Sequence, residues 1–296
     1  MSESFLVTGA LGCIGAWTTR VLVREGTPVV ALDAATDRRR LELVLDDEEL
    51  DRVTFLHGDI TDLASIERVL DEHGITHVVH LAALQVPFVR ADPPAGSRVN
   101  VVGTTNLFEA ARRHGVPGLA YASSAAVWGP RGTLDPETLY GVFKLATEGM
   151  ARIFWAESGL ASVGLRPYVV FGPGRDQGVT SAPTLAMEAA ARGEPFRIAF
   201  GGRTQFHYAP DVAAAFVAAA RSARDGASVH DLGGPGVHMR EVVAAIEAAA
   251  PEARGTIEFD DVQLPFPEQI EGDYAGYRAT PLEEAVRETI AMLRGR

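Results

Sequence analysis

The chain has 296 residues, 47% of them hydrophobic, and a formal net charge of −12 at pH 7. This acidic balance disfavours nucleic acid and anionic membrane surfaces as partners. The single cysteine excludes an internal disulfide and suits a reducing compartment. The N-terminus lacks the basic and apolar regions of a signal peptide, and no apolar run is long enough to span a membrane, so we expect a cytoplasmic protein.

Three glycines at intervals of three follow a short apolar run. Phe5–Val7 predicts a buried strand, then come Gly9, Gly12 and Gly15, and a helical pattern begins at Ile14. In a dinucleotide site such glycines permit a sharp turn, the approach of a pyrophosphate and close packing of the helix. The spacing differs from G-x-G-x-x-G, and a tight turn without a ligand is the alternative. We predict cofactor contacts from Gly9, Gly12, Cys13, Ile14 and Gly15.

A carboxylate follows the second predicted strand, over 29–32. Asp33 lies 24 residues after Gly9, close to the ~20 expected of an acid that binds the adenosine ribose. The arginines at 38–40 offer charge for a 2′-phosphate, but Asp33 would repel it, and a solvated surface is their simpler interpretation. NAD is therefore favoured over NADP. A third strand over 53–59 ends on Asp59, which would bind the adenine amino group or cap the helix near Asp62.

Strands alternate with helices through residue 171. Further strands are predicted over 77–83, 119–124 and 162–171, and helices over 96–114 and 139–158. This alternation predicts a doubly wound parallel sheet, a Rossmann fold, with ligands beyond the carboxyl ends of its strands. We assign residues 1–172 to an NAD-binding domain, to which about 204–234 return. Residues 173–296 form mainly a smaller, interleaved substrate-binding domain, with helices over 182–192, 211–221, 239–250 and 281–293 and short strands over 197–200 and 229–234.

A phenol and an ammonium lie four residues apart on the helix over 139–158. Tyr140 and Lys144 therefore share one helix face, where the cation would favour ionisation of the phenol. Ser124, at the end of the preceding strand, can hold a carbonyl or alcohol oxygen. Such a group handles protons beside a hydride carrier. An ordinary surface pair is the alternative interpretation of Tyr140 and Lys144.

The chain resembles the extended short-chain dehydrogenases/reductases of the NAD-dependent epimerase/dehydratase family along nearly its whole length. The matching segments are 8–15, Gly58-Asp59, 80–83, 100–104, 123–129, Tyr140 with Lys144, 166–173, 211–213 and 281–284. The resemblance implies catalysis by Ser124, Tyr140 and Lys144, and a homodimer built from the helices over 96–114 and 139–158. The other predicted cofactor contacts are Asp33, Asp59, Ile60, Leu81, Ala82, Ala83, Asn100, Tyr140, Lys144, Pro167 and Val169.

The chain departs from the pattern of nucleotide-sugar enzymes in this family. Those enzymes typically carry a diphosphate-binding asparagine where this chain has Val169, and the arginine of a later segment is displaced here to Arg203. The interval between Ser124 and Tyr140 is also short. We therefore expect oxidoreduction of a secondary alcohol of a small sugar-like or hydroxy-acid substrate. Nucleotide-sugar epimerisation (or dehydration) with tightly bound NAD is the alternative, and a non-catalytic dinucleotide-binding protein is a third.

Substrate contacts are expected from the loop after the fourth strand and from the smaller domain. No pattern of metal ligands is present, and we predict no metal site. The predicted substrate residues are Gln85, Arg90, Ser124, Thr180, Ser181, Arg203 and His207.

Overall fold

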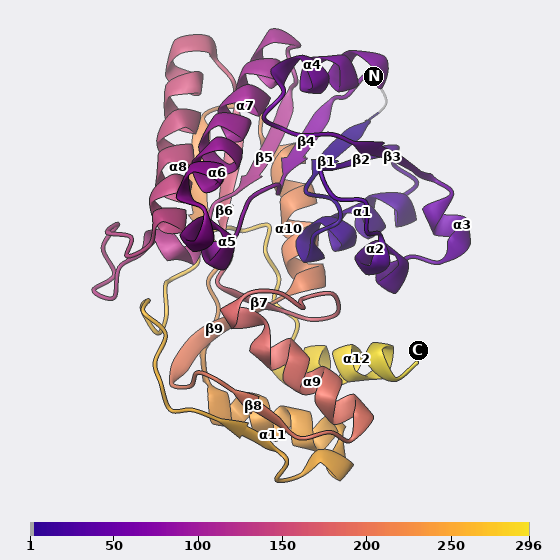
Figure 1. Cartoon of the computed structure of the whole chain (residues 1–296). Coiled ribbons are helices and arrows are strands. Elements are labelled where there is room, and N and C mark those ends of the chain that lie inside the picture. Colours follow the sequence, from indigo (N-terminus) through magenta and orange to yellow (C-terminus); the bar gives the residue numbers. More distant parts are fainter. Residues whose placement is uncertain (1–2, 296) are drawn as a thin grey trace.

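A seven-stranded, wholly parallel sheet forms the centre of the protein (Figure 1). The computed structural model describes residues 3–295. The strand order is β10-β6-β5-β4-β1-β2-β3, so it reverses beside β1, where the ligand crevice of such sheets opens. The predicted doubly wound fold is confirmed. The strands are β1 (Phe5–Thr8), β2 (Val29–Asp33), β3 (Val53–His57), β4 (His77–His80), β5 (Gly118–Ala122), β6 (Ser162–Arg166) and β10 (Ala227–Asp231).

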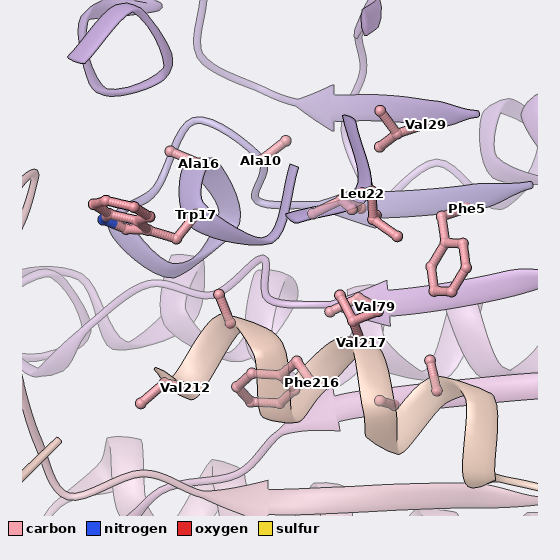
Figure 2. Packing of buried hydrophobic residues seen from close by; sticks show 14 of the residues in the cluster. Phe5, Ala10, Ala16, Trp17, Leu22, Val29, Val79, Val212, Phe216 and Val217 are labelled. Carbon is pink, nitrogen blue, oxygen red and sulfur yellow. The ribbon is translucent and has the colours of Figure 1, made fainter. Parts of the chain in front are cut away.

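Helices cover both faces of this sheet. On one face α1 (Cys13–Arg24) and α10 (Ala209–Ser222) bury their apolar sides, and Figure 2 shows Trp17, Phe216 and Phe5 in that cluster. On the other face lie α4 (Leu63–Glu72), α7 (Thr104–Arg113) and α8 (Leu139–Ser158). Because both faces are covered, the central strands are buried on both sides, and all four residues of β1 and of β4 are buried. The short helices α2 (Arg39–Val44) and α3 (Asp47–Leu50) follow β2.

The segment before α7 is more helical than we predicted. It contains α5 (Val86–Ala91), α6 (Pro93–Ser97) and a π-helical stretch, η1 (Arg98–Gly103), that runs into α7. Residues 92–94, which precede the helix predicted over 96–114, are the start of a helix. Asp92 caps α6 by accepting a hydrogen bond from the amide of Ala95 at 2.9 Å. Prolines are tolerated in a first helical turn, where no amide hydrogen is needed.

The strand predicted over 162–171 is two strands in two different sheets. β6 ends at Arg166, and β7 (Val169–Phe171) begins after Pro167 and pairs with β9 (Arg203–Tyr208). Proline has no amide hydrogen for a sheet ladder, so the pairing stops there. At this point the chain leaves the large sheet for the smaller domain.

The smaller domain has its own apolar core and two small sheets, β11-β9-β7 and β12-β8. In the segment 204–234, α10 packs in the core beside the large sheet and β10 is a strand of that sheet, whereas β9 pairs with β7 and β11 in a small sheet. No helix within residues 3–295 is both long and apolar enough to cross a membrane. The remaining elements are η2 (Ala125–Val127), η3 (Val179–Ser181), α9 (Ala182–Arg192), β8 (Phe196–Ile198), β11 (Gly236–His238), α11 (Met239–Ala249), η4 (Pro251–Ala253), β12 (Ile257–Phe259) and α12 (Leu282–Arg294).

Candidate active site

The glycine turn between β1 and α1 is packed too tightly for side chains. A Cβ at Gly9, where φ is +69°, would lie 2.6 Å from the amide nitrogen of Ala82. At Gly15 it would lie 2.2 Å from the carbonyl oxygen of Gly9. Real Cβ contacts are never this short. The first glycine therefore admits the loop after β4, and the third lets α1 approach the turn.

The N-terminus of α1 offers free amide hydrogens to an anion. Among the residues that the structure describes, no side chain caps this helix, whose N-cap is Gly12. The first amides of an α-helix, here those of Cys13, Ile14 and Gly15, have no partner within the helix. Together with the helix dipole they suit a pyrophosphate. The turn therefore fits the phosphates of a dinucleotide.

Asp33 lies at the carboxyl end of β2, beside the glycine turn. Its two carboxylate oxygens accept hydrogen bonds from the amides of Leu11 and Ala35, each at 2.9 Å. A carboxylate has about four acceptor positions, so capacity remains for ribose hydroxyls. Two of the nearby arginines are not free for a 2′-phosphate, since Arg39 and Arg40 both pair with Asp176. This arrangement is consistent with NAD.

The structure separates the two roles that we considered for Asp59. Asp62 caps α4 through the amide of Ser65, while the side chain of Asp59 accepts from the amide of Thr61 and Asp59 is exposed just beyond the end of β3. The residue after it, Ile60, is buried. Asp59 is therefore free of the capping role and stays a predicted adenine contact.

The loop after β4 runs beside the glycine turn, where Leu81 and Ala82 donate amide hydrogen bonds to the carbonyl and hydroxyl oxygens of Thr8. Asn100 holds this loop. Its side-chain oxygen accepts from the amide of Leu84 at 2.7 Å, and its side-chain nitrogen donates to the carbonyl of Leu84 at 2.9 Å. Ala83 lies between these anchors. Asn100 therefore positions the predicted cofactor-binding loop, and its own amide group is occupied.

Ser124, Tyr140 and Lys144 come together beyond the carboxyl end of β5. The Ser124 hydroxyl acts to lower the pKa of the Tyr140 phenol, and Lys144 Nζ lies 5.6 Å from the centroid of the Tyr140 ring. The hydroxyl of the neighbouring Ser123 is turned inward and bonds to the buried Glu148. Only the second serine thus faces the tyrosine.

The electrostatics of Tyr140 differ from our expectation that Lys144 lowers its pKa. Burial raises the pKa of the Tyr140 phenol, and the groups that oppose this rise are the Ser124 hydroxyl and the Arg175 guanidinium. The Lys144 ammonium is directed elsewhere, donating a hydrogen bond to the carbonyl of Ala122 at 2.6 Å. Burial also lowers the pKa of Lys144 to about 8, which Glu148 partly opposes.

Arg175 is the functional candidate that sequence reasoning missed. Its guanidinium donates to the side-chain oxygen of Gln85 at 3.2 Å and to the hydroxyl of Thr180 at 3.0 Å, thereby joining two predicted substrate residues. Its Nε atom is buried and has no partner among the described residues. A buried donor without a partner costs roughly 1–3 kcal/mol, so this atom is suited to meet a substrate or cofactor oxygen.

Three predicted contacts lie elsewhere. Val169 is 1% exposed, in the core of the smaller domain, so its side chain cannot line a cofactor site. Both ring nitrogens of His207 are bonded to the backbone, at 3.0 Å to the amide of Tyr168 and at 2.6 Å to the carbonyl of Gly233. Burial lowers the pKa of His207 to about 4. This histidine is thus a satisfied core residue.

The third is Arg203, whose guanidinium is exposed and donates to the carbonyl of Gly236 at 2.7 Å. This bond directs it along the small sheet of the second domain. Two other predicted contacts make local hydrogen bonds: Ser181 donates to the carbonyl of Gly178, and the carbonyl of Pro167 accepts from the amide of Ala125. The predicted substrate residue Arg90 is exposed on α5.

Several known proteins that are similar to this chain are named as 4-epimerases. A 33% identical UDP-glucuronate 4-epimerase 2 of Arabidopsis thaliana matches 57% of this chain, which spans only 42% of that relative. UDP-glucose 4-epimerase of Mycolicibacterium smegmatis is 32% identical over 82% of both chains. The solved UDP-glucose 4-epimerase of Thermus thermophilus with NAD superposes with a TM-score of 0.83, at 27% identity and 99% coverage of both chains.

An L-threonine 3-dehydrogenase built on a partial consensus shares the fold, with a TM-score of 0.84, 24% identity, and 99% of this chain and 100% of that chain covered. The family model described as "NAD dependent epimerase/dehydratase family" matches residues 5–233. The predicted NAD dependence is that of the family. On this match and on the relative aligned over most of both chains, the protein belongs to the NAD-dependent epimerase/dehydratase family of extended short-chain dehydrogenases/reductases.

Proposed function

We propose that the protein is an NAD-dependent sugar epimerase that acts on a nucleotide sugar, the alternative in our sequence analysis. The observation that carries this proposal is that Ser124, Tyr140 and Lys144 lie at the carboxyl ends of the strands, as the glycine turn does. The chain also aligns over 82% of its length with a UDP-glucose 4-epimerase. Bound NAD would supply a hydride acceptor and, in the return step, a hydride donor. Inversion follows when the ketone presents its other face before the hydride returns.

In this proposal Tyr140 exchanges a proton with the reacting oxygen of the substrate. Burial keeps the phenol protonated at neutral pH by raising its pKa, which suits proton donation to a ketone, and the Arg175 charge eases formation of the phenolate needed for oxidation. Ser124 holds the same oxygen by a hydrogen bond. Lys144, fixed to the Ala122 carbonyl, is placed for the hydroxyls of a ribose beside the nicotinamide.

Net dehydrogenation of a small hydroxy acid or polyol, our first expectation, is the second candidate. Two observations favour it. The side chain of Val169 is buried in the smaller domain and offers nothing to a diphosphate. The displaced Arg203 is already bonded to Gly236. A diphosphate requires charge-assisted contacts of the kind these positions lack.

A substrate panel separates the two candidates. The purified protein is incubated with UDP-glucose, UDP-glucuronate, free sugars, sugar acids and hydroxy acids, and product configuration is read by NMR together with NADH absorbance. Inversion of a UDP-sugar without net NADH is the expected result. Accumulation of NADH in proportion to an oxidised small substrate would replace the epimerase proposal by the dehydrogenase. Neither product from any substrate would contradict both.

We also propose a homodimer in which α8 and the η1–α7 helix pack against their counterparts. Val142 and Ile153 on α8 and Val102 on η1 are 45%, 42% and 46% exposed, although all three are apolar. Val142 and Ile153 are separated by three helical turns, so they share one face of α8. Apolar residues gathered on one helical face favour an interface.

A further inference from the structure

The loop that follows β7 crosses from the glycine turn to the catalytic group. We call residues 172–178 of this loop the strap. It has positive φ angles at Gly172, Gly174 and Gly178, of 119°, 86° and 88°, where glycine is strongly favoured. In Figure 1 the loop after β7 extends toward the part of the molecule that holds α1 and α2.

One part of the strap is fastened to the glycine turn. The indole nitrogen of Trp17, in the first turns of α1, donates a hydrogen bond to the carbonyl of Pro173 at 2.9 Å. Asp176 accepts from Arg40, at 3.0 Å from Nε and 2.6 Å from Nη2, and from Arg39 at 3.0 Å. Arg40 also donates to the carbonyl of Leu11, inside the glycine turn. This ion pair therefore ties the strap to the cofactor-binding loop itself.

Arg175, the residue before Asp176, connects the strap to the catalytic group. Arg175 bonds to Gln85 after β4 and to Thr180 in η3, and its charge acts on Tyr140. The strap thus runs from the N-terminus of α1, which suits a pyrophosphate, to the tyrosine, where a nicotinamide must lie. A bound dinucleotide spans the same two points. A strap held at both points would oppose release of the dinucleotide along this line.

We propose that the strap retains NAD between catalytic steps, and that the Arg40–Asp176 ion pair is the clasp that keeps it closed. Asp176 is then a positioning residue, acting on the cofactor through Arg40 and the strap. Side-chain exposure is only 16% for Arg40 and 30% for Asp176, so solvent screens this pair less than a surface pair. Two Arg40 nitrogens donate to one carboxylate oxygen of Asp176, Oδ1, while Arg39 donates to the other, so both oxygens are held. Retention of the cofactor is what an epimerase requires, because the hydride must return to the same substrate.

The dissociation rate of NAD tests directly whether the Arg40–Asp176 ion pair slows release of the cofactor. Protein loaded with NAD is freed of excess nucleotide and mixed with an excess of isotopically labelled NAD, and the bound nucleotide is followed by mass spectrometry. Asp176→Asn should accelerate release on the order of tenfold, since charged hydrogen bonds are lost. Asp176→Glu keeps the charge and should restore part of the slow release.

Asp37→Asn is the matched control. Asp37 also pairs with Arg39, at 3.5 Å, but it is exposed and is not part of the strap, so its replacement should leave release unchanged. If Asp176→Asn does not fold, Arg40→Lys serves the same purpose, because lysine lacks the two-point contact. Release from the Asp176 variant within twofold of the wild-type rate, or equal acceleration by the Asp37 variant, would overturn the proposal. The assay uses no substrate. The retention proposal can therefore be rejected while the epimerase proposal stands, and the epimerase proposal can be rejected while the retention proposal stands.

Discussion

Tyr140 is half-buried, and the Ser124 hydroxyl and the Arg175 charge both act to lower the pKa of its phenol. Replacement by phenylalanine removes the proton relay and leaves the glycine turn untouched. We expect Tyr140→Phe to lower kcat by roughly 10²–10⁴-fold with NAD affinity unchanged. Steady-state kinetics and calorimetric titration with NAD measure the two quantities.

Tyr121→Phe provides a matched control for that variant. The hydroxyl of Tyr121 is buried in β5 and has no hydrogen-bond partner among residues 3–295. Its removal should leave kcat within about twofold of the wild-type value and should not destabilise the protein. Turnover by Tyr140→Phe equal to that of this control would show that another residue moves the proton.

The ammonium of Lys144 is 6% exposed, and its burial carries a cost in stability. Burial lowers its pKa from 10.5 to about 8, so between these values the unfolded chain binds more protons than the folded one. Lys144 therefore costs stability below about pH 8, and the cost fades as the pH rises toward 10.5.

Lys144→Met should consequently raise the free energy of unfolding of the NAD-free protein at pH 7 by on the order of 1–3 kcal/mol. The gain should shrink above about pH 9, while catalysis and NAD affinity fall at every pH. Urea denaturation across this pH range measures the difference. A variant that is less stable than wild type at pH 7 would contradict the pKa assignment.

At the scale of single elements, local sequence predicted most of the strands of the large sheet. The apolar run before Gly9 and the carboxylate of Asp33 lie where parallel-strand topology places them. The prediction of one strand over 162–171 was wrong. The residues on both sides of Pro167 favour β-structure, but those before it pair with β5 in the large sheet and those after it pair with β9 in a small sheet.

Arg175 was missed for a related reason. A glycine-rich loop with charges, such as 172–176, is typical of any exposed turn, and nothing local reveals which site it crosses. Its contacts with Gln85 and Thr180 depend on tertiary packing. Val169 was predicted as a cofactor contact with the family resemblance and His207 as a substrate contact from the smaller domain, but both side chains are buried.

The exposed apolar face of α8 leads to a test of the proposed dimer. Val142→Asp would place an unpaired charge in the interface, so we expect a monomer in analytical ultracentrifugation at micromolar concentration. Val262→Asp is the control, because Val262 is 60% exposed in the smaller domain, away from α8. Dissociation by both variants, or by neither, would argue against an interface on this helix.

At the scale of the whole molecule, a buried charge network joins α8, β6 and β10. Arg166 binds Glu148 at 2.7 Å and Asp231 at 3.0 Å, and all three side chains are at most 12% exposed. Trp128 donates to Asp231, and the Arg166 guanidinium lies over its ring. Removing one member leaves buried charges without partners.

Arg166→Met should therefore cost about 3–5 kcal/mol of the free energy of unfolding. The exposed Arg197, which pairs with Glu258 and Asp260, offers a comparison, and Arg197→Met should cost far less, because solvent screens exposed ion pairs. Urea denaturation of both variants measures the difference. Equal losses would mean that the network does not hold the edge strand β10.

The detour of the chain through the smaller domain has a consequence for synthesis on the ribosome. β6 is complete at Arg166, but its neighbour β10 begins about 60 residues later and ends at Asp231. At roughly 5–20 residues per second, the nascent sheet presents an unpaired β6 for several seconds. The unpaired amide and carbonyl groups of a strand edge invite pairing with another chain. The growing polypeptide should therefore engage chaperones most strongly between these two lengths, and release them once β10 has emerged.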